Sequence, residues 1–394
     1  MSQQLLVDVG TSKSLANRAL IVKSFFPDLN IEVNSQCDDV ETLKTALEGL
    51  LNGDSEFTFL EGGTSFRFFV ARASRLSRKV KIKASEKLLS RPHSELYKCL
   101  RSLGVKVREE SDFIEVEGPW ELSKSVEVSC EKSTQFASAI LLSSLCLENN
   151  FSVKLKDLSH SVSYLEMTTS ILRSLGLCEF EKKDSKVFFD SSNSVPKKSS
   201  LTLESDWSSA VSVAALAVFS KAITISGLAR PSLQSDSLIF EIFEKMGIKQ
   251  SFENGNWTVF PAKSFSGIQI DLANSPDLFP VLALVCTFAD SPSYFSGLKN
   301  LQYKESHRIK KVSEILERLG VNFEASDSDF RIVDTLEVGQ VESTGKWSFS
   351  PDSDHRMAMS AAVARLVGAR VTIEDQDVVR KSFPGYWEVY RSLM

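Results

Sequence analysis

A motif that recurs along the chain constrains its fold more than any other feature. Amphipathic segments end in LRSLGV, LRSLGL, FEKMGI and LERLGV, at intervals of about 72 residues. Their glycines, Gly104, Gly176, Gly247 and Gly320, each follow the last apolar position of a helical pattern. Helices commonly end at a residue with a positive φ, which glycine adopts most easily. Because strand-like sequence follows each glycine, the pattern predicts a repeated α/β element with a surface helix.

Other segments are apolar on almost every side, which is typical of helices buried in a core. They cover residues 13–25, 62–74, 133–147, 206–219, 276–288 and 354–368. Strand-like runs such as KVKIKAS, SVKLKDL and RVTIEDQ flank them. Buried and amphipathic segments together form a β-α-β-α-β-β repeat. Six buried helices indicate six repeats, the first and last incomplete, and therefore an α/β (α+β) fold.

Length and composition narrow the possible classes of protein. A chain of 394 residues exceeds one ordinary core, so we expect two domains of three repeats each. The net charge of −5 disfavours nucleic acid as a partner. No apolar run reaches the ~18 residues of a membrane span, and no signal peptide is evident. Six scattered cysteines without CxxC spacing fit a cytoplasmic protein. The absence of metal-ligand and nucleotide-binding motifs predicts no metal and no cofactor.

Basic residues at the starts of the buried segments point to an anionic ligand. Ser, Thr and Asp at such positions are ordinary N-caps. Cations are disfavoured beside the positive end of a helix, so Lys13, Arg18, Arg67 and Arg356 are best explained by a bound anion. Further cations lie in or near loops, and any one of them alone would be taken for a surface charge: Arg91, Lys304, Arg308 and Lys381.

Two acids accompany these cations. Asp277 precedes a buried segment and Glu305 stands beside Lys304. Acids whose pKa values are tuned apart could serve as catalytic base and acid. The alternatives are a helix cap for Asp277 and a surface ion pair for Glu305, and the sequence alone leaves both open. We expect His93, His160 and His307 on the surface or in turns, and His355 is as compatible with a structural role as with a functional one.

The motifs, taken in order, resemble the EPSP synthases, the 3-phosphoshikimate 1-carboxyvinyltransferase branch of the enolpyruvyl transferases. The resemblance covers nearly the whole chain, from Thr11 to Phe383. It is carried by SKSLANRAL, GGTSFR, SRPHSEL, STQFASAIL, SYLEMTTSILRSLG, SDWSSA, SPDLFPVLAL, NLQYKESHR, DSDHRMAM and RKSFPGYWE.

This resemblance implies a fold and a domain organisation. The family has two lobes, each an inside-out α/β barrel of three β-α-β-α-β-β repeats, which agrees with the repeat found above. It implies an N-terminal lobe of residues 11–203 and a C-terminal lobe of residues 1–10 plus 204–394. The chain would then cross between the lobes near Gly10 and Leu203, and closure of the lobes would assemble the site. The family is usually monomeric.

The resemblance also implies an activity, transfer of the enolpyruvyl group of phosphoenolpyruvate to the 5-hydroxyl of shikimate 3-phosphate, on the route to chorismate and the aromatic amino acids. Asp277 would be the base, and Glu305 with Lys13 would protonate the methylene carbon. Shikimate 3-phosphate would contact Lys13, Ser14, Arg18, Ser133, Thr134, Gln135, Ser161, Asp277, Asn300 and Lys304. Phosphoenolpyruvate would contact Lys13, Gly63, Arg91, Gln135, Arg308, Arg356 and Lys381, with Arg67 in support.

The sequence departs from the family pattern at several places. Asp8-Val9-Gly10-Thr11 replaces the usual Pro-Gly before Ser12, Glu61 replaces a common asparagine, and Val162-Ser163 replaces a basic residue and proline. His307 replaces an acid. These changes motivate one alternative, an inactive binding module, against which the retained acids and cations argue. The other alternative is transfer to UDP-N-acetylglucosamine, but the loop KASEKLLSRP lacks the reactive cysteine of that family.

Overall fold

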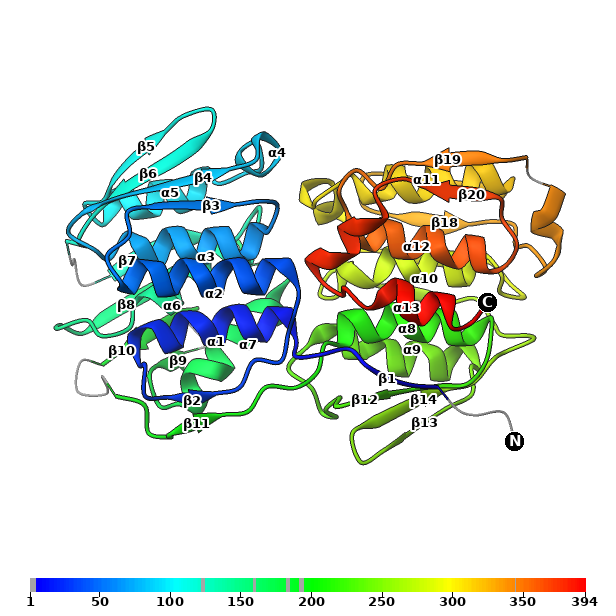
Figure 1. Cartoon of the computed structure of the whole chain (residues 1–394), viewed down its shortest axis with the longest axis horizontal. Coiled ribbons are helices and arrows are strands. Elements are labelled where there is room, and N and C mark those ends of the chain that lie inside the picture. The colour runs from blue at the N-terminus through cyan, green and yellow to red at the C-terminus, as the bar shows by residue number, and fades with distance from the viewer. Residues whose placement is uncertain (1–4, 122–124, 159–160, 182–184, 191–194, 344) are drawn as a thin grey trace. The chain divides into compact units, whose positions relative to one another are not determined.

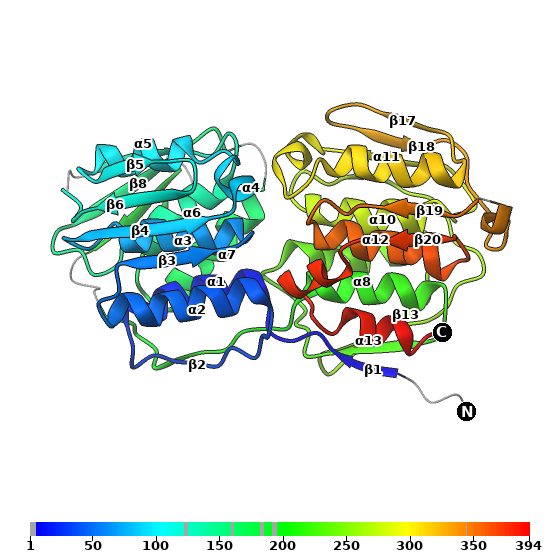
Figure 2. The same cartoon turned by 45° about the horizontal axis from the view of Figure 1, so that its top comes forward.

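The computed structural model describes residues 5–121, 125–158, 161–181, 185–190, 195–343 and 345–394. The chain divides into two compact units. Unit 1 contains Met1–Ser12 and Glu204–Met394, and unit 2 contains Lys13–Leu203. The crossing points expected at Gly10 and Leu203 lie close to these divisions. Both units contain helices and strands in alternation, which agrees with the expected α/β class (Figures 1 and 2).

Unit 2 begins with an incomplete repeat and continues with two full ones. Its elements are α1 (Lys13–Phe25), β2 (Asn30–Ile31), α2 (Asp38–Leu51), β3 (Glu56–Phe59), α3 (Gly63–Ala73), β4 (Lys79–Ala84), α4 (Glu86–Leu89), α5 (Ser94–Ser102), β5 (Lys106–Glu109), β6 (Phe113–Glu117), β7 (Ser125–Ser129), α6 (Thr134–Ser143), β8 (Phe151–Lys156), α7 (Val162–Ser174), β9 (Glu179–Glu181), β10 (Lys186–Phe189) and β11 (Ser200–Leu201).

Unit 1 takes its first strand from the start of the chain. Its elements are β1 (Leu5–Asp8), α8 (Trp207–Val218), β12 (Ile223–Ser226), η2 (Ser235–Leu238), α9 (Ile239–Met246), β13 (Gln250–Glu253), β14 (Asn256–Val259), β15 (Gln269–Asp271), η3 (Pro276–Leu278), α10 (Phe279–Cys286), β16 (Ser293–Ser296), η4 (Lys299–Tyr303), α11 (Arg308–Leu319), β17 (Phe323–Ala325), β18 (Phe330–Ile332), η5 (Gln340–Ser343), β19 (Trp347–Phe349), α12 (His355–Leu366), β20 (Val371–Ile373), η6 (Gln376–Lys381) and α13 (Tyr386–Arg391).

The described four-stranded sheets share one strand order. They run β3-β4-β6-β5 and β7-β8-β10-β9 in unit 2, and β1-β12-β14-β13 and β15-β16-β18-β17 in unit 1. In each sheet the first two strands are parallel and the hairpin adds two antiparallel strands. Pairing of Leu5 with Ile223 joins the start of the chain to unit 1. The remaining described pairs, β11-β2 and β19-β20, belong to the incomplete repeats.

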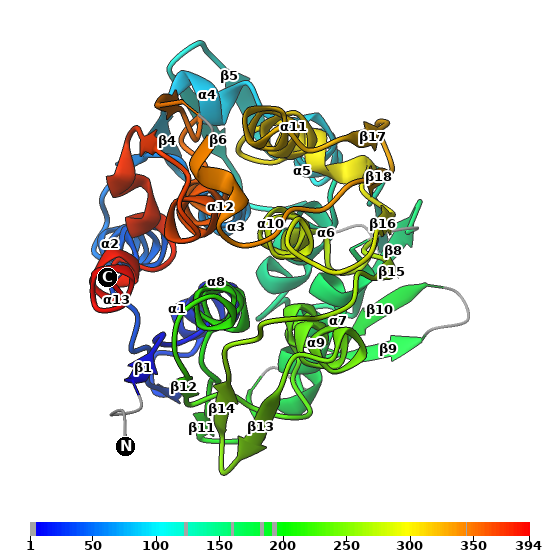
Figure 3. The ribbon, with the colours of Figure 1, turned by 90° about the vertical axis from the view of Figure 1, so that its right-hand side faces the viewer.

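The helices expected to be buried form the core of each unit. In unit 2, α1, α3 and α6 contact one another, and in unit 1, α8, α10 and α12 do the same. Figure 3 shows the three helices of unit 1 end-on, with α9, α11 and α13 outside them. Every residue of α10 is buried, as expected of a helix that is apolar on all sides. The N-termini of these helices are therefore fixed by packing.

The four recurring glycines end helices or their last turns with positive φ, as the sequence pattern predicts. Their φ values are 78° at Gly104, 71° at Gly176, 79° at Gly247 and 74° at Gly320. A side chain at such a residue strains the backbone, whatever space surrounds it. The recurring glycine thus reflects the positive φ that the backbone requires where these helices end.

We predict that Gly320→Ala lowers the free energy of unfolding by about 1–2 kcal/mol, because alanine disfavours the left-handed region. A Cβ at Gly320 would meet no atom within 4 Å, so steric overlap contributes nothing. Urea denaturation measures the change. Gly345→Ala is the control, since a Cβ there also meets open space and the backbone is not left-handed. Equal stability of both variants would contradict this reading.

Candidate active site

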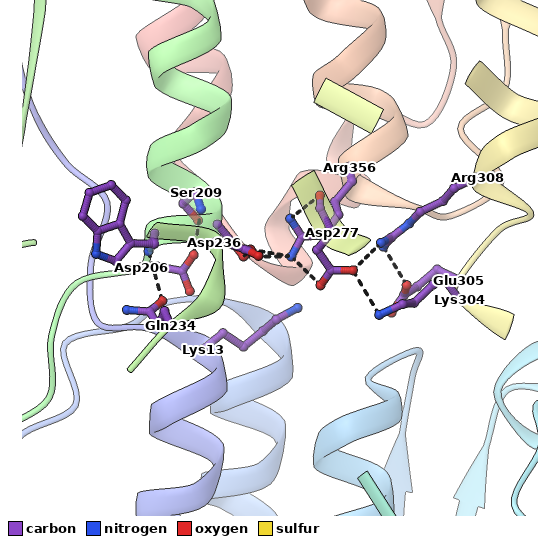
Figure 4. A network of polar contacts seen from close by, with 12 residues as sticks. Lys13, Asp206, Ser209, Gln234, Asp236, Asp277, Lys304, Glu305, Arg308 and Arg356 are labelled. Carbon is purple, nitrogen blue, oxygen red and sulfur yellow. Dashed lines mark hydrogen bonds and ion pairs between the residues drawn. The ribbon is translucent and has the colours of Figure 1, made fainter. Parts of the chain in front are cut away.

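Three segments of unit 1 bring charged side chains into one network. The turn η3 carries Asp277, the segment from η4 into α11 carries Lys304, Glu305 and Arg308, and the start of α12 carries Arg356. Figure 4 shows these side chains converging, joined by hydrogen bonds and ion pairs. Each segment precedes a helix, and α10 and α12 belong to the buried core. The network is therefore mounted on rigid elements.

Arg308 lies at the centre of this network and is 1% exposed. Its Nη1 donates to Asp277 at 2.6 Å and its Nη2 donates to Glu305 at 2.9 Å. Its Nε donates to Asp354 at 2.8 Å. Burial would lower the pKa of the guanidinium, but the three carboxylates outweigh it and raise that pKa. Arg308 is therefore a permanent buried cation that holds three acids in place.

Asp277 is an ionised acid surrounded by cations. Its Oδ1 lies 3.0 Å from Lys304 Nζ and 2.6 Å from Arg308 Nη1, and its Oδ2 lies 3.0 Å from Arg356 Nη2. Burial acts to raise the pKa of Asp277, but Arg356, Lys304 and Arg308 together hold it well below its usual value. Neither η3 nor α10 has a side-chain cap. Asp277 itself lies inside η3 and is not the N-cap residue of η3 or of α10, which are Ser275 and Leu278.

A second acid, Asp236, lies on the other side of Arg356. Its Oδ2 is 3.9 Å from Arg356 Nη2 and accepts a hydrogen bond from Ser208. The same Nη2 donates to Ser208 Oγ at 2.9 Å. Burial raises the pKa of Asp236 to about 6, although Arg356 opposes this shift. Asp236 and Asp277 therefore compete for one guanidinium, and Asp277 is closer to it.

Asp354 links the network to the backbone of α12. Its Oδ1 accepts a hydrogen bond from Arg356 N at 3.0 Å, and so caps the helix. Its Oδ2 accepts hydrogen bonds from Arg308 Nε at 2.8 Å and from Ser306 Oγ at 3.0 Å. The carboxylate is fully buried. One side chain thus positions Arg308 and Arg356 together.

The remaining expected residues of unit 1 are both buried. Lys381, at the end of η6, donates from Nζ to the carbonyl oxygen of Ser353, 3.1 Å away and just before α12. Asn300 lies in η4, four residues before Lys304. The structure thus places Lys381 beside the start of α12, and Asn300 on the segment that leads into the network.

Unit 2 contains a second group of expected residues at the start of α3. The Arg91 guanidinium packs directly on Gly63, because a Cβ added there would lie 2.6 Å from Arg91 Nη1. One helical turn later, Arg67 donates from Nη1 to Gln135 Oε1 at 2.5 Å. The first turns of α3 thus contact Arg91 through Gly63 and contact Gln135 through Arg67.

A third group joins α1 to α7, also in unit 2. Arg18 is 1% exposed and donates to Thr168 Oγ1 at 2.8 Å, to the Ser14 carbonyl at 2.7 Å and to the Tyr164 carbonyl at 2.8 Å. Burial lowers the pKa of Arg18 to about 10. These bonds tie Arg18 to the protein itself in the absence of substrate.

The other expected contacts of unit 2 lie at helix starts. Ser133 caps α6 by accepting from Gln135 N at 3.2 Å. Thr134 donates to the carbonyl of Ser161 at 3.2 Å, and Ser161 adopts a left-handed φ of 53° before α7. At the start of α1, Lys13 forms an ion pair with Asp39 at 3.1 Å. No motif in the sequence marks Asp39.

Some expectations are corrected by the structure. His93 lies in the connection between α4 and α5, but it is 3% exposed, so of the two alternatives, surface or turn, the surface is wrong. Glu305 pairs with a buried arginine rather than forming a surface ion pair. His307, by contrast, is half-buried at the start of α11, where its Nδ1 accepts from Lys310 N at 3.5 Å. His160 lies outside the described residues.

The sequence reasoning missed acids that complete the network. Asp354 stands two residues before Arg356 in the DHR motif, so that motif could have indicated it. Asp236 lies in SLQSDSL, where no local signal marks it. Asp236 reaches Arg356 only because η2 packs against α8. Such contacts between distant segments cannot be read from local patterns.

The departure at Glu61 has a structural explanation. Glu61 Oε1 accepts a hydrogen bond from Ser85 Oγ at 2.7 Å. Ser85 also caps α4 by accepting from Leu88 N at 3.1 Å. The acid thus anchors the segment that leads to Arg91, and its charge is partly satisfied by that hydroxyl.

Within the described part of the chain, no three or more His, Cys, Asp or Glu side chains are grouped so as to hold a metal ion. No helix among those residues is long and apolar enough to span a membrane.

Solved structures with the same fold define the class of this protein. An EPSP synthase from Acinetobacter baumannii matches with a TM-score of 0.72 at 19% identity, covering 100% of this chain and 96% of that one. The enolpyruvyl transferase NikO from Streptomyces tendae matches with a TM-score of 0.70 at 16% identity, covering 100% and 95%. The fold is that of the enolpyruvyl transferases.

Sequence comparisons identify the family within this class. The profile described as EPSP synthase (3-phosphoshikimate 1-carboxyvinyltransferase) matches residues 24–390. The 3-phosphoshikimate 1-carboxyvinyltransferase of Caldivirga maquilingensis is 30% identical over 82% of this chain and 76% of its own length. That of Bacteroides fragilis (strain YCH46) is 28% identical over 98% and 94%. The chain belongs to the EPSP synthase family.

We predict that Asp354→Asn lowers the free energy of unfolding by about 3 kcal/mol, because it leaves the buried Arg308 short of one anionic partner. Asparagine can still cap α12, so the change isolates the charge. Urea denaturation measures the loss. Glu95→Gln is the control, since it removes an exposed ion pair with Lys98 and should cost less than about 1 kcal/mol. A loss no larger than the control's would contradict the role given to Asp354.

Proposed function

We propose that this protein transfers the enolpyruvyl group of phosphoenolpyruvate to the 5-hydroxyl of shikimate 3-phosphate and releases phosphate, a step toward chorismate and the aromatic amino acids. Family membership supports the reaction. The observation that carries its chemistry is Asp277, an ionised acid held among Lys304, Arg308 and Arg356. These cations suit substrates that carry phosphate and carboxylate groups.

We assign the substrate contacts to residues of both units. Shikimate 3-phosphate would use Lys13, Ser14, Arg18, Ser133, Thr134, Gln135 and Ser161 of unit 2, and Asp277, Asn300 and Lys304 of unit 1. Phosphoenolpyruvate would use Lys13, Gly63, Arg91 and Gln135 of unit 2, and Arg308, Arg356 and Lys381 of unit 1. Burial of the cations Arg18, Arg308, Arg356 and Lys381 supports this assignment, because cations act most strongly on anions where water is excluded.

Substrate binding would activate Asp277 as a base. In the free protein its carboxylate is stabilised by three cations, so it is a weak proton acceptor. When substrate anions bind those cations, the positive potential at Asp277 falls and its pKa rises. The base would thus gain strength with each substrate that binds and would be strongest when both are bound. This coupling would protect phosphoenolpyruvate from reaction with water.

The reaction would proceed by addition and elimination. Asp277 takes the proton of the 5-hydroxyl as its oxygen forms a bond to C2 of phosphoenolpyruvate. Glu305, which must take up a proton beforehand, delivers it together with Lys13 to C3, which gives a tetrahedral intermediate. Loss of a proton from C3 and cleavage of the bond from C2 to the phosphate oxygen then yield the enol ether and phosphate. The cations stabilise the charge on the departing phosphate.

The finer features of the fold and setting are also proposals. We propose that each unit is an inside-out α/β barrel of three repeats, supported by the shared strand order of its four-stranded sheets. We further propose that the enzyme acts as a monomer in the cytoplasm. The six cysteines are free, and five of them are buried, which suits a reducing compartment.

Phosphate release with phosphoenolpyruvate and one acceptor at a time tests the function. We expect turnover with shikimate 3-phosphate and none with UDP-N-acetylglucosamine. Turnover with the UDP-sugar alone would assign the chain to the other acceptor. Absence of turnover with both would support a binding module. Either result would overturn the proposed reaction.

We predict that Glu305→Gln lowers kcat by about 10²–10⁴-fold, because glutamine cannot donate a proton to carbon. Binding of shikimate 3-phosphate, measured by calorimetry, should change little. Glu314→Gln is the control on the same segment, since Glu314 pairs with Lys311 away from Arg308. A kcat equal to that of the control would remove Glu305 from its assigned role.

A further inference from the structure

We propose that His93 is a positioning residue for this reaction, acting through Arg67 to orient the amide of Gln135. The inference rests on the proposed function, which assigns Gln135 to both substrates. It concerns the histidine of the SRPHSEL motif, to which the family resemblance assigns no role. The imidazole contacts the guanidinium of Arg67, and that guanidinium contacts the amide of Gln135, all within unit 2.

His93 occupies the N-cap position of α5, but its side chain does not cap that helix. The imidazole instead turns inward and is 3% exposed. Its ring centroid lies 5.2 Å from that of Phe66 and 5.7 Å from that of Tyr97, with which it stacks. The ring therefore has one defined orientation in the core of unit 2.

The hydrogen bonds of His93 fix which nitrogen carries the proton. Its Nε2 lies 2.8 Å from the carbonyl oxygen of Leu88, which can only accept. Its Nδ1 lies 3.2 Å from Arg67 Nε, which can only donate. The proton must therefore be on Nε2, and Nδ1 must present its lone pair to Arg67. A second proton on Nδ1 would break the bond to Arg67.

The surroundings keep this imidazole neutral. Burial lowers the pKa of His93 to about 3, and the charges of Arg67 and Arg91 add to this effect. The bond to the Leu88 carbonyl opposes the shift but does not outweigh it. His93 is thus a neutral bridge at physiological pH, with no part in proton transfer.

Arg67 transmits this orientation to Gln135. The guanidinium is 2% exposed and makes three directed bonds, from Nε to His93, from Nη2 to the Pro92 carbonyl at 3.1 Å and from Nη1 to Gln135 Oε1 at 2.5 Å. It also lies 5.2 Å from the centroid of the Phe136 ring. Because arginine cannot accept a hydrogen bond, Gln135 must turn its oxygen toward Arg67. Its NH2 group then lies on the other branch of the amide, as a donor suited to an anion.

The same turn of chain also places Arg91. Arg91 packs on Gly63 at the start of α3, while Pro92 and His93 bind Arg67 one helical turn later. Ser85 fastens the beginning of this segment to Glu61. His93 therefore holds one end of the segment that carries Arg91. Through Arg67, it also orients the NH2 group of Gln135.

Two variants of His93 separate its two bonds. In His93→Asn, the amide oxygen can take the place of Nδ1 and still accept from Arg67. In His93→Gln, the amide nitrogen can take the place of Nε2 and still donate to Leu88, but the acceptor for Arg67 is lost. Each variant keeps one hydrogen bond in the same buried site, so a purely structural role predicts similar effects of both.

We expect His93→Gln to raise the KM for phosphoenolpyruvate by roughly tenfold, and His93→Asn by less than about threefold, with kcat little changed. In a Gln135→Ala background, His93→Gln should have little further effect on that KM. Equal KM values for the two His93 variants, or fully additive effects with Gln135→Ala, would overturn the proposal.

The wild-type protein offers a test that depends on neither turnover nor the folding of variants. Nitrogen-15 NMR of the histidine side chains should show His93 as the neutral Nε2–H form between about pH 5 and pH 9. A charged imidazole or the Nδ1–H form would overturn the bridge to Arg67. Wild-type protein without turnover would contradict the proposed function, while this spectrum would still decide whether the bridge exists.

Discussion

The buried guanidinium of Arg308 is the constraint on which the site of unit 1 depends. A buried cation costs several kcal/mol unless anions surround it closely. Asp354, Asp277 and Glu305 meet this requirement from three segments of the chain. Each carboxylate is thereby fixed relative to the other two. The geometry of the proposed base and the proposed acid thus follows from the need to neutralise one arginine.

The cations proposed to bind substrate are paired with acids of the protein. Lys304, Arg308 and Arg356 pair with Asp277 in unit 1. In unit 2, Lys13 pairs with Asp39. Substrate anions would therefore share these cations with the protein's own carboxylates. Binding and basicity would be coupled in this way, because a cation shared with a substrate would raise the proton affinity of Asp277.

Much of the fold follows from local sequence patterns. The recurring glycines mark helix ends with positive φ, and the segments apolar on all sides are the buried helices of both units. Local sequence succeeds here because burial and φ are properties of single segments. The family resemblance supplied the expected residues of the site, and the structure brings Asp277, Lys304, Glu305, Arg308 and Arg356 of unit 1 into one network. The local sequence left open whether Asp277 was a helix cap. The structure shows that Asp277 is not the N-cap residue of η3 or of α10.

The parts that local sequence could not provide depend on contacts between distant segments. His93 follows an arginine and a proline in a loop, which favours exposure, yet Phe66 and Tyr97 enclose it. Asp236 has no motif, and only the packing of η2 against α8 takes it to Arg356. Both residues act on neighbours that are far away in the sequence. Such partners can be found only when the three-dimensional arrangement is known.

We expect substrate anions to raise the basicity of Asp277. Carbon-13 NMR of labelled aspartate carboxyls measures it directly, with Asp277→Asn to assign the signal. In the free protein the pKa of Asp277 should lie well below its usual value. Saturation with phosphoenolpyruvate should raise that pKa by about one unit or more. A pKa that stays the same or falls on saturation would contradict the account.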